Sequence, residues 1–230
     1  MTDSHHHHIL SQFESDLRRL REAVLAMASQ AQENLAHAIR GLLERDVELC
    51  HKTISQDDEV DDLEKRIDHQ GMMIIVKYSP VARDLRRVVS TMKIAQALER
   101  VSDQASNIAK RAKKIAGNPE IPETAAIQPL YDLVSGLLRD AITAFSDGDV
   151  AVARQLSDRD EEVDKLHKAL SKKLMKRLEV DSTHVQDYVD ILFAVRFLER
   201  IGDYAVNIGE DAVYSESAVD IRHPKKTPGD

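Results

Sequence analysis

Tryptophan is absent from this chain of 230 residues, and aromatic residues make up only 4% of it. Glycine and proline are also scarce, with eight and six residues. Few helix breakers together with 42% hydrophobic residues indicate long helices that pack through Leu, Ile, Val and Ala. The composition therefore predicts an all-α protein with a substantial apolar core.

Other absences limit location and function. The single cysteine, Cys50, excludes an internal disulfide framework and fits a reducing compartment. No run of about eighteen apolar residues occurs, so we expect no segment that spans a membrane. The start "MTDSHHHHIL" has no apolar signal region, which makes secretion unexpected. A formal charge of −8 argues against binding to nucleic acid. We therefore expect a cytoplasmic protein.

Two stretches of the sequence return at a nearly fixed distance. "ALERVSDQASNIA" (97–109) returns as "FLERIGDYAVNIG" (197–209), an offset of 100 residues. "DDEVDDLEK" (57–65) returns as "DEEVDKLHK" (160–168), an offset of 103 residues. A length difference of three residues between the second and third helix of each half reconciles the two offsets. The chain is therefore a tandem duplication.

Each half is expected to hold three helices, because apolar residues recur at steps of three and four. Asp46 is predicted to cap the second helix. This helix is expected to stop near "YSP" (78–80), with Ser79 and Pro80 beginning the third. In the second half, breaks are expected near 146–149 and 180–183. The apolar stripes of the first half include Leu17, Leu20, Val24 and Met27; Val60, Leu63, Ile67 and Ile74; and Ile94, Leu98, Val101 and Ala105.

These stripes and breaks predict two tandem three-helix bundles related by a pseudo-two-fold repeat. The stretch "GNPEIPETAAIQP" joins them. His5–His8 are interpreted as part of a flexible, functionally silent extension, and the end "HPKKTPGD" as a mobile tail. The predicted segments are the extension 1–8, the first bundle 9–118, a linker 119–128, the second bundle 129–215 and the tail 216–230.

Four pairs of acidic residues stand four positions apart, which places both carboxylates of a pair on one helix face, about 5–6 Å apart at Cβ. Folding the second and third helix of each half back on each other brings two pairs to the same height, since both helices rise about 1.5 Å per residue. Each bundle should then present one patch of four carboxylates, away from the apolar stripe and open to solvent. The pairs are Asp57/Asp61 and Glu99/Asp103 in the first half, and Asp160/Asp164 and Glu199/Asp203 in the second.

Carboxylates placed so closely repel one another unless they are protonated or bridged by a cation. Oxygen ligands without cysteine suit Mg, Mn, Fe or Zn. Acidic pairs on solvated helix faces are also common, so the spacing leaves a metal site and a solvated face both open. Asp164-x-x-His167 resembles half of a di-iron carboxylate motif. Its counterpart in the first half ends in Glu64, and we interpret His167 as part of a solvated face.

Catalytic signatures are missing from the sequence. No nucleophile elbow, phosphate-binding loop or pair of catalytic histidines occurs, so no catalytic residue is assigned. The basic stretch "RDLRR" (83–87) is interpreted as either an exposed surface or a contact for a partner.

Three stretches carry a family resemblance: "SPVARDLRRVVSTMKIAQALERVSDQASNIAKRA" (79–112), "FAVRFLERIGDYAVNIGEDAV" (193–213) and "HILSQFESDLRRL" (8–20). On these stretches the chain resembles the PhoU family of phosphate-specific transport regulators over nearly its whole length. The resemblance implies two three-helix bundles and metal ions at E(D)xxxD motifs, which coincide with the four acidic pairs. The second half has "DSTHVQDYV" where the first has "SPVARDLRR", so that surface is not duplicated.

The resemblance also implies a function. It points to a non-enzymatic cytoplasmic regulator that couples the ATPase subunit of the phosphate ABC transporter to a phosphate-sensing histidine kinase. Such a regulator keeps the phosphate-starvation response off when phosphate is plentiful, and lies peripheral to the membrane through its partners. Helix-rich surfaces favour a homodimer. Two other functions stay open: a metal-dependent enzyme acting on phosphate compounds, and a buffer that binds metal or phosphate without a protein partner.

Overall fold

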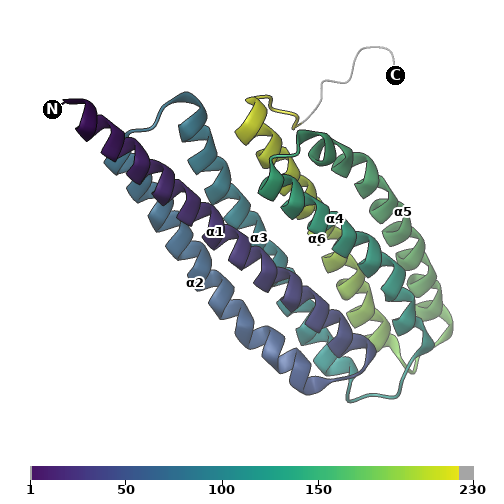
Figure 1. The fold of residues 1–230 in the computed structure, drawn as a ribbon. Coiled ribbons are helices and arrows are strands. Elements are labelled where there is room, and N and C mark those ends of the chain that lie inside the picture. The colour runs from purple at the N-terminus through teal and green to yellow at the C-terminus, as the bar shows by residue number, and fades with distance from the viewer. Residues whose placement is uncertain (1, 223–230) are drawn as a thin grey trace, which may run out of the picture.

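The computed structural model describes residues 2–222, which form six long α-helices and one short 3-10 helix (Figure 1). No strand occurs among these residues, so the all-α prediction is confirmed. None of the helices within this range combines the length and the apolar composition that crossing a membrane requires. The elements are α1 (Thr2–Leu43), α2 (Val47–Tyr78), α3 (Ala82–Ile115), η1 (Pro122–Ile127), α4 (Gln128–Asp147), α5 (Val150–Val180) and α6 (Val185–Ser217).

The helices form two bundles of three that lie side by side. Helices α1–α3 make the first bundle and α4–α6 the second (Figure 1). Helices α3 and α6 pack against each other along the centre, while α2 and α5 form the two outer edges. Successive helices of a bundle run antiparallel because short turns join them. The prediction of two tandem three-helix bundles is confirmed.

One large apolar core runs through both bundles. Leu20, Val60 and Leu98, one from each predicted stripe of the first half, have no exposed surface. Leu63 is only partly buried and packs at the edge of this core. Full burial of a valine or leucine side chain, as at Leu20, Val60 and Leu98, stabilises the folded state by about 1.5–3 kcal/mol. Tertiary packing of the apolar stripes therefore holds the helices together, more than their intrinsic helix propensity.

Short-range signals end and begin several helices. Asp46 caps α2 as predicted, because its carboxylate accepts a hydrogen bond from the backbone N–H of Leu49 at 2.9 Å. Asp149 caps α5 in the same way and accepts from two backbone N–H groups. Gly148 ends α4 with a φ of 69°, a left-handed conformation that glycine adopts without strain. Both breaks predicted in the second half are present.

The prediction that Ser79 and Pro80 begin the third helix is wrong. Ser79 ends α2 instead: its φ is 46° and its backbone N–H donates to the carbonyl of Ile75 at 2.9 Å. Helix α3 begins at Ala82, after the extended residue Val81. A Ser-Pro pair fits the end of one helix as well as the start of the next, because proline lacks the N–H that a continuing helix needs.

The predicted segments and the helix bounds differ at the chain ends. Helix α1 begins at Thr2, inside the predicted extension 1–8. Helix α6 ends two residues inside the predicted tail 216–230, and residues 223–230 lie outside the described residues. The short helix η1 lies within the predicted linker 119–128. The division into an extension, two domains, a linker and a tail stays a prediction.

Candidate functional site

The first cluster of carboxylates lies where α2 packs against α3. Asp57 and Asp61 come from α2, and Glu99 and Asp103 from α3. Burial is the main cause that raises the pKa of Asp57 and of Glu99. The nearby charges of Asp61 and Asp103 raise both pKa values further. The antiparallel fold-back therefore brings the four predicted residues of the first half within electrostatic reach of one another.

Buried hydrogen bonds hold Asp57 in this first cluster. The Ser102 hydroxyl donates to Asp57 Oδ1 at 2.8 Å, and the Asn34 amide donates to Ser102 Oγ at 3.0 Å. Asn34 belongs to α1, so the chain of hydrogen bonds connects the first helix of the bundle to the cluster. Burial raises the pKa of Asp57, and the hydrogen bond from Ser102 partly opposes this effect.

The second cluster lies where α5 packs against α6. Asp160 and Asp164 come from α5, and Glu199 and Asp203 from α6. Burial raises the pKa of Asp160 to about 6, and the charges of the other three residues add to this effect. Burial also raises the pKa of Glu199, as does the charge of Asp203. The structure therefore brings the four predicted residues of the second half together as well.

The two clusters differ at the position that faces the first aspartate. Gly202 takes the place of Ser102 in the second half, at the repeat offset of 100. A Cβ on Gly202 would lie 2.7 Å from Asp160 Oδ1 and 3.3 Å from Val163 Cγ1, so α6 approaches α5 closely at this point. No hydroxyl group is available there to donate to Asp160. The duplicated clusters are therefore not equivalent.

The clusters are less open than the sequence indicates. Asp203 is exposed and six of the eight carboxylates are partly buried, but Glu199 is only 8% exposed. Within residues 2–222, Glu199 Oε2 is buried without a hydrogen-bond partner. The expectation that every site residue faces open solvent is wrong for Glu199.

Basic side chains of the protein already lie against both clusters. The pairs are Arg100–Glu99 (3.2 Å), Lys168–Asp164 (2.8 Å) and Arg196–Glu199. The basic partner is more than half exposed in each pair. Exposed ion pairs contribute only about 0–1 kcal/mol each, so the Lys168–Asp164 contact presents a small barrier to a divalent cation.

Two residues outside the predicted site also lie beside the clusters. The charge of Glu64 contributes to the raised pKa of Glu99, after burial and nearer charges. His167 is half-buried, its pKa is lowered by burial, and Asp164 and Asp203 are among its charged neighbours. The interpretation of His167 as part of a solvated face stays a prediction, since the side chain is partly exposed. The Asp164-x-x-His167 spacing is the signal for it, since one helical turn places both side chains on one face.

The donor chemistry of the clusters fits a divalent cation. As placed in the described part of the chain, no three His, Cys, Asp or Glu side chains converge closely enough to hold one. Burial nevertheless raises the pKa values of Asp57 and Asp160, and Glu199 Oε2 lacks a hydrogen-bond partner within residues 2–222. A cation would stabilise such groups in their ionised form. Binding would require the side chains to turn toward a common point between helices that already lie side by side.

The raised pKa of Asp160 predicts how stability depends on pH. The pKa rises from 3.8 to about 6 on folding, so between these values the folded state holds a proton that the unfolded chain has released. Stability should therefore fall as pH rises through this window. We expect Asp160→Asn to raise the free energy of unfolding of the chelator-treated protein at neutral pH by about 1 kcal/mol, a small effect because solvent screens a partly exposed cluster.

Urea unfolding across this pH range measures the effect. The free energy of unfolding of Asp160→Asn should depend less steeply on pH than that of the wild type, because asparagine stays neutral. Asp158→Asn, at an exposed position two residues away, is the matched control and should keep the wild-type slope. If the free energy of unfolding changed equally with pH in all three proteins, Asp160 would not be the source of the pH dependence.

Comparison with known proteins identifies the family. The PhoU domain family matches residues 24–112 and 127–212, one match in each three-helix half. This chain belongs to the PhoU family. The double match also confirms that the duplication seen in the sequence is a repeat of one PhoU domain.

Relatives of similar length support this assignment. A protein of Pseudomonas putida is 31% identical over 218 residues, which cover 94% of this chain and 85% of the relative. One of Rhizobium meliloti is 33% identical over 211 residues, covering 91% and 89%. Both are named phosphate-specific transport system accessory protein PhoU homolog.

Solved PhoU structures share the fold. The crystal structure of PhoU from Pseudomonas aeruginosa matches with a TM-score of 0.87 at 29% identity, over 90% of this chain and all of that one. PhoU from Streptococcus pneumoniae, a phosphate transport system regulatory protein, matches with a TM-score of 0.84 at 25% identity, over 91% and 99%. The PhoU family is one of accessory and regulatory proteins, not of enzymes.

Proposed function

We propose that this protein is an accessory regulator of phosphate uptake and of phosphate-starvation signalling. The observation that carries the proposal is the PhoU match in both halves, together with relatives named as accessory proteins of the phosphate-specific transport system. In this role it acts as an adaptor between the ATPase subunit of the phosphate ABC transporter and a sensor histidine kinase. It keeps the kinase response off when phosphate is plentiful. The proposal places it in the cytoplasm as a homodimer, peripheral to the membrane through its partners.

The turn between α2 and α3 supports the adaptor role. Val76 and Val81 are 71% and 74% exposed, and Met72, Met73 and Leu85 lie exposed around the same turn. Clustered exposed apolar side chains are typical of protein-binding surfaces. The corresponding turn of the second bundle also exposes apolar side chains, Met175, Val180 and Val185, but its sequence differs, so the two turns present different surfaces.

The basic stretch beside this turn is only partly free for a partner. Arg83 Nη2 lies 2.9 Å from Glu216 Oε2, and Arg87 Nε lies 3.7 Å from Glu216 Oε1. Both contacts join α3 to α6, and so connect the two bundles. The apolar residues of the turn are therefore the stronger candidates for partner contact than the arginines.

Metal ions at the two clusters form the second part of the proposal. The ligands would come from the eight predicted carboxylates, and Mg, Mn, Fe or Zn fits oxygen donors of this kind. A bound cation would neutralise the repulsion within each cluster and would connect α2 to α3 and α5 to α6. We assign the metal a regulatory or structural role, because the relatives are named as accessory and regulatory proteins.

Binding between purified proteins tests the adaptor role. We expect the protein to bind the transporter ATPase subunit and the kinase with micromolar affinity in isothermal titration calorimetry. Replacing Val76 and Val81 by serine should weaken binding to at least one partner by about tenfold, because buried apolar contacts dominate interfaces.

The matched control replaces Val180 and Val185, at the corresponding turn of the second bundle, by serine. This control should bind both partners as the wild type does. No binding of the wild-type protein to either partner at micromolar concentrations would contradict the adaptor role. Metal-stimulated hydrolysis of a phosphate compound that is lost on Glu99→Ala with Asp103→Ala would instead favour the enzymatic alternative.

A further inference from the structure

Helix α5 carries a basic surface that the proposed function does not use. Residues 165–178 contain six Lys or Arg residues and no Asp or Glu, in a chain whose formal charge is −8. The positive charges are therefore concentrated on one helix of an acidic protein. The basic residues are Lys165, Lys168, Lys172, Lys173, Lys176 and Arg177.

The duplication supplies an internal comparison for this surface. At the repeat offset of 103, the corresponding residues of α2 are 62–75. They contain two basic residues, Lys65 and Arg66, and three acidic ones, Asp62, Glu64 and Asp68. The same helix in the same bundle architecture therefore has a small excess of negative charge. The basic surface of α5 is not a requirement of the fold.

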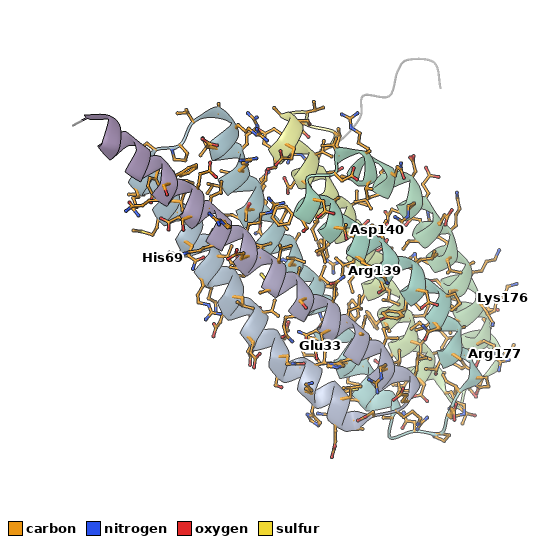
Figure 2. The ribbon with its side chains drawn as sticks, viewed as in Figure 1. Glu33, His69, Arg139, Asp140, Lys176 and Arg177 are labelled. Atoms are coloured by element: carbon orange, nitrogen blue, oxygen red, sulfur yellow. The ribbon has the colours of Figure 1, made fainter. Side chains whose placement is uncertain are left out.

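Three of the lysines have no acidic partner. Lys172, Lys173 and Lys176 are exposed, and they form no ion pair within the part of the chain that the structure describes. By contrast, Arg177 Nε lies 2.7 Å from Glu123 Oε1 and so has a structural contact. Figure 2 shows Lys176 on α5 at the outer edge of the molecule. These three charges are available to an external anionic ligand.

Exposed apolar side chains lie among the lysines. Met175 is 59% exposed and stands between Lys173 and Lys176, while Val180 at the end of α5 is 74% exposed. Helix α5 packs only on its inner side, against α4, α6 and η1 (Figure 1). A helix face that combines lysines with exposed apolar side chains is typical of binding to the interface of a lipid bilayer.

We propose that this face of α5 binds directly to an anionic phospholipid surface. The lysines contact the negative headgroups, and Met175 and Val180 enter the boundary between headgroups and acyl chains. From Lys165 to Lys176 the charges extend over about 17 Å of helix, an arrangement that matches many charges on a plane better than one small anion. This binding goes beyond the adaptor role and does not depend on it.

Co-sedimentation with vesicles tests the proposal. The full chain is mixed, in the presence of a chelator, with vesicles of phosphatidylglycerol and phosphatidylcholine or of phosphatidylcholine alone. The chelator prevents metal ions from bridging carboxylates and headgroups. We expect binding only to vesicles that contain phosphatidylglycerol, and weaker binding as salt is added. Changing Lys172, Lys173 and Lys176 to glutamine should lower the partition coefficient about fivefold per lysine, about a hundredfold in total.

Two further variants separate local charge from net charge. Changing Lys52, Lys65 and Arg66 on α2 to glutamine removes the same net charge and should change the partition coefficient by no more than about twofold. Changing Met175 and Val180 to serine should lower it by about tenfold, because the apolar contact is lost. Circular dichroism confirms that each variant is folded.

Two results would overturn the proposal. One is the absence of binding to phosphatidylglycerol vesicles at low salt, which would leave an acidic protein surface as the ligand class for these lysines. The other is an equal loss of binding in both triple variants, which would show that net charge alone decides. The assay contains neither the transporter nor the kinase, so its failure would not affect the adaptor proposal.

Discussion

Arg111→Met is expected to lower the free energy of unfolding by about 3 kcal/mol. Arg111 lies on α3, and its Nη1 donates to Asp190 Oδ1 on α6 at 2.7 Å. Asp190 is only 1% exposed. Without the guanidinium, an ionised carboxylate would remain in the interior with one other donor, the Gln186 amide at 3.1 Å. The cost arises mainly from this uncompensated buried charge.

The same arginine also contacts an aromatic ring across the two bundles. The Arg111 guanidinium carbon lies 4.3 Å from the centroid of the Phe193 ring. A cation over an aromatic face contributes about 0.5–1 kcal/mol at a partly exposed site. Since both contacts join α3 to α6, their loss should weaken the packing of the two bundles against each other.

Urea unfolding followed by far-ultraviolet circular dichroism measures this effect. A second variant, Arg111→Met with Asp190→Leu, should recover most of the lost stability, because apolar residues can replace both members of a buried ion pair. Lys110→Met, at an exposed neighbouring position, is the control and should stay within about 0.5 kcal/mol of the wild type. A loss below about 1 kcal/mol for Arg111→Met would show that the pair is not important at the interface.

Gly202→Leu is expected to damage the second cluster and to cost about 3 kcal/mol, at the upper end for overpacking of a closely packed contact. A Cβ at this position would already lie 2.7 Å from Asp160 Oδ1 and 3.3 Å from Val163 Cγ1. The leucine side chain must therefore push α5 away from α6. Because the first cluster lies between other helices, its carboxylates should keep their arrangement.

The expected signature is a selective loss of metal. If both clusters bind metal, Gly202→Leu should retain about half of the metal content of the wild type, in addition to its lower stability. Gly136→Leu on α4 is the matched control, because a Cβ there would lie 3.8 Å from Arg159 Nη2, an ordinary van der Waals contact. This control should leave the metal content and the free energy of unfolding unchanged. Full metal content in Gly202→Leu would contradict the placement of the second site.

Much of this architecture could be predicted because it repeats. The spacing of Leu20, Val60 and Leu98 with their neighbours indicates helix faces, and each of the three side chains is buried. The duplication and the antiparallel fold-back place the acidic pairs at equal heights, since helical rise is constant. For example, Asp57 and Asp103 lie far apart in sequence but within electrostatic reach in the structure.

Features that depend on contacts between helices could not be predicted in the same way. The close approach of α5 to α6 at Gly202, where a Cβ would lie 2.7 Å from Asp160 Oδ1, depends on how the helices pack, and so does the burial of Glu199. The pairing of Arg111 with Asp190 depends on how the two bundles pack, and no local pattern encodes it. Ser79 was predicted at the wrong helix end because a Ser-Pro pair fits either end.

Metal analysis tests the central claim of two carboxylate sites most directly. The protein is purified under native conditions in a form lacking His5–His8, so that these histidines cannot contribute metal. We predict that elemental analysis finds bound Mg, Mn, Fe or Zn in the wild-type sequence. Glu99→Gln with Asp103→Asn should remove the metal of the first cluster, and Glu199→Gln with Asp203→Asn that of the second. Absence of metal in the unsubstituted protein, or full retention when all four residues are replaced, would contradict the claim.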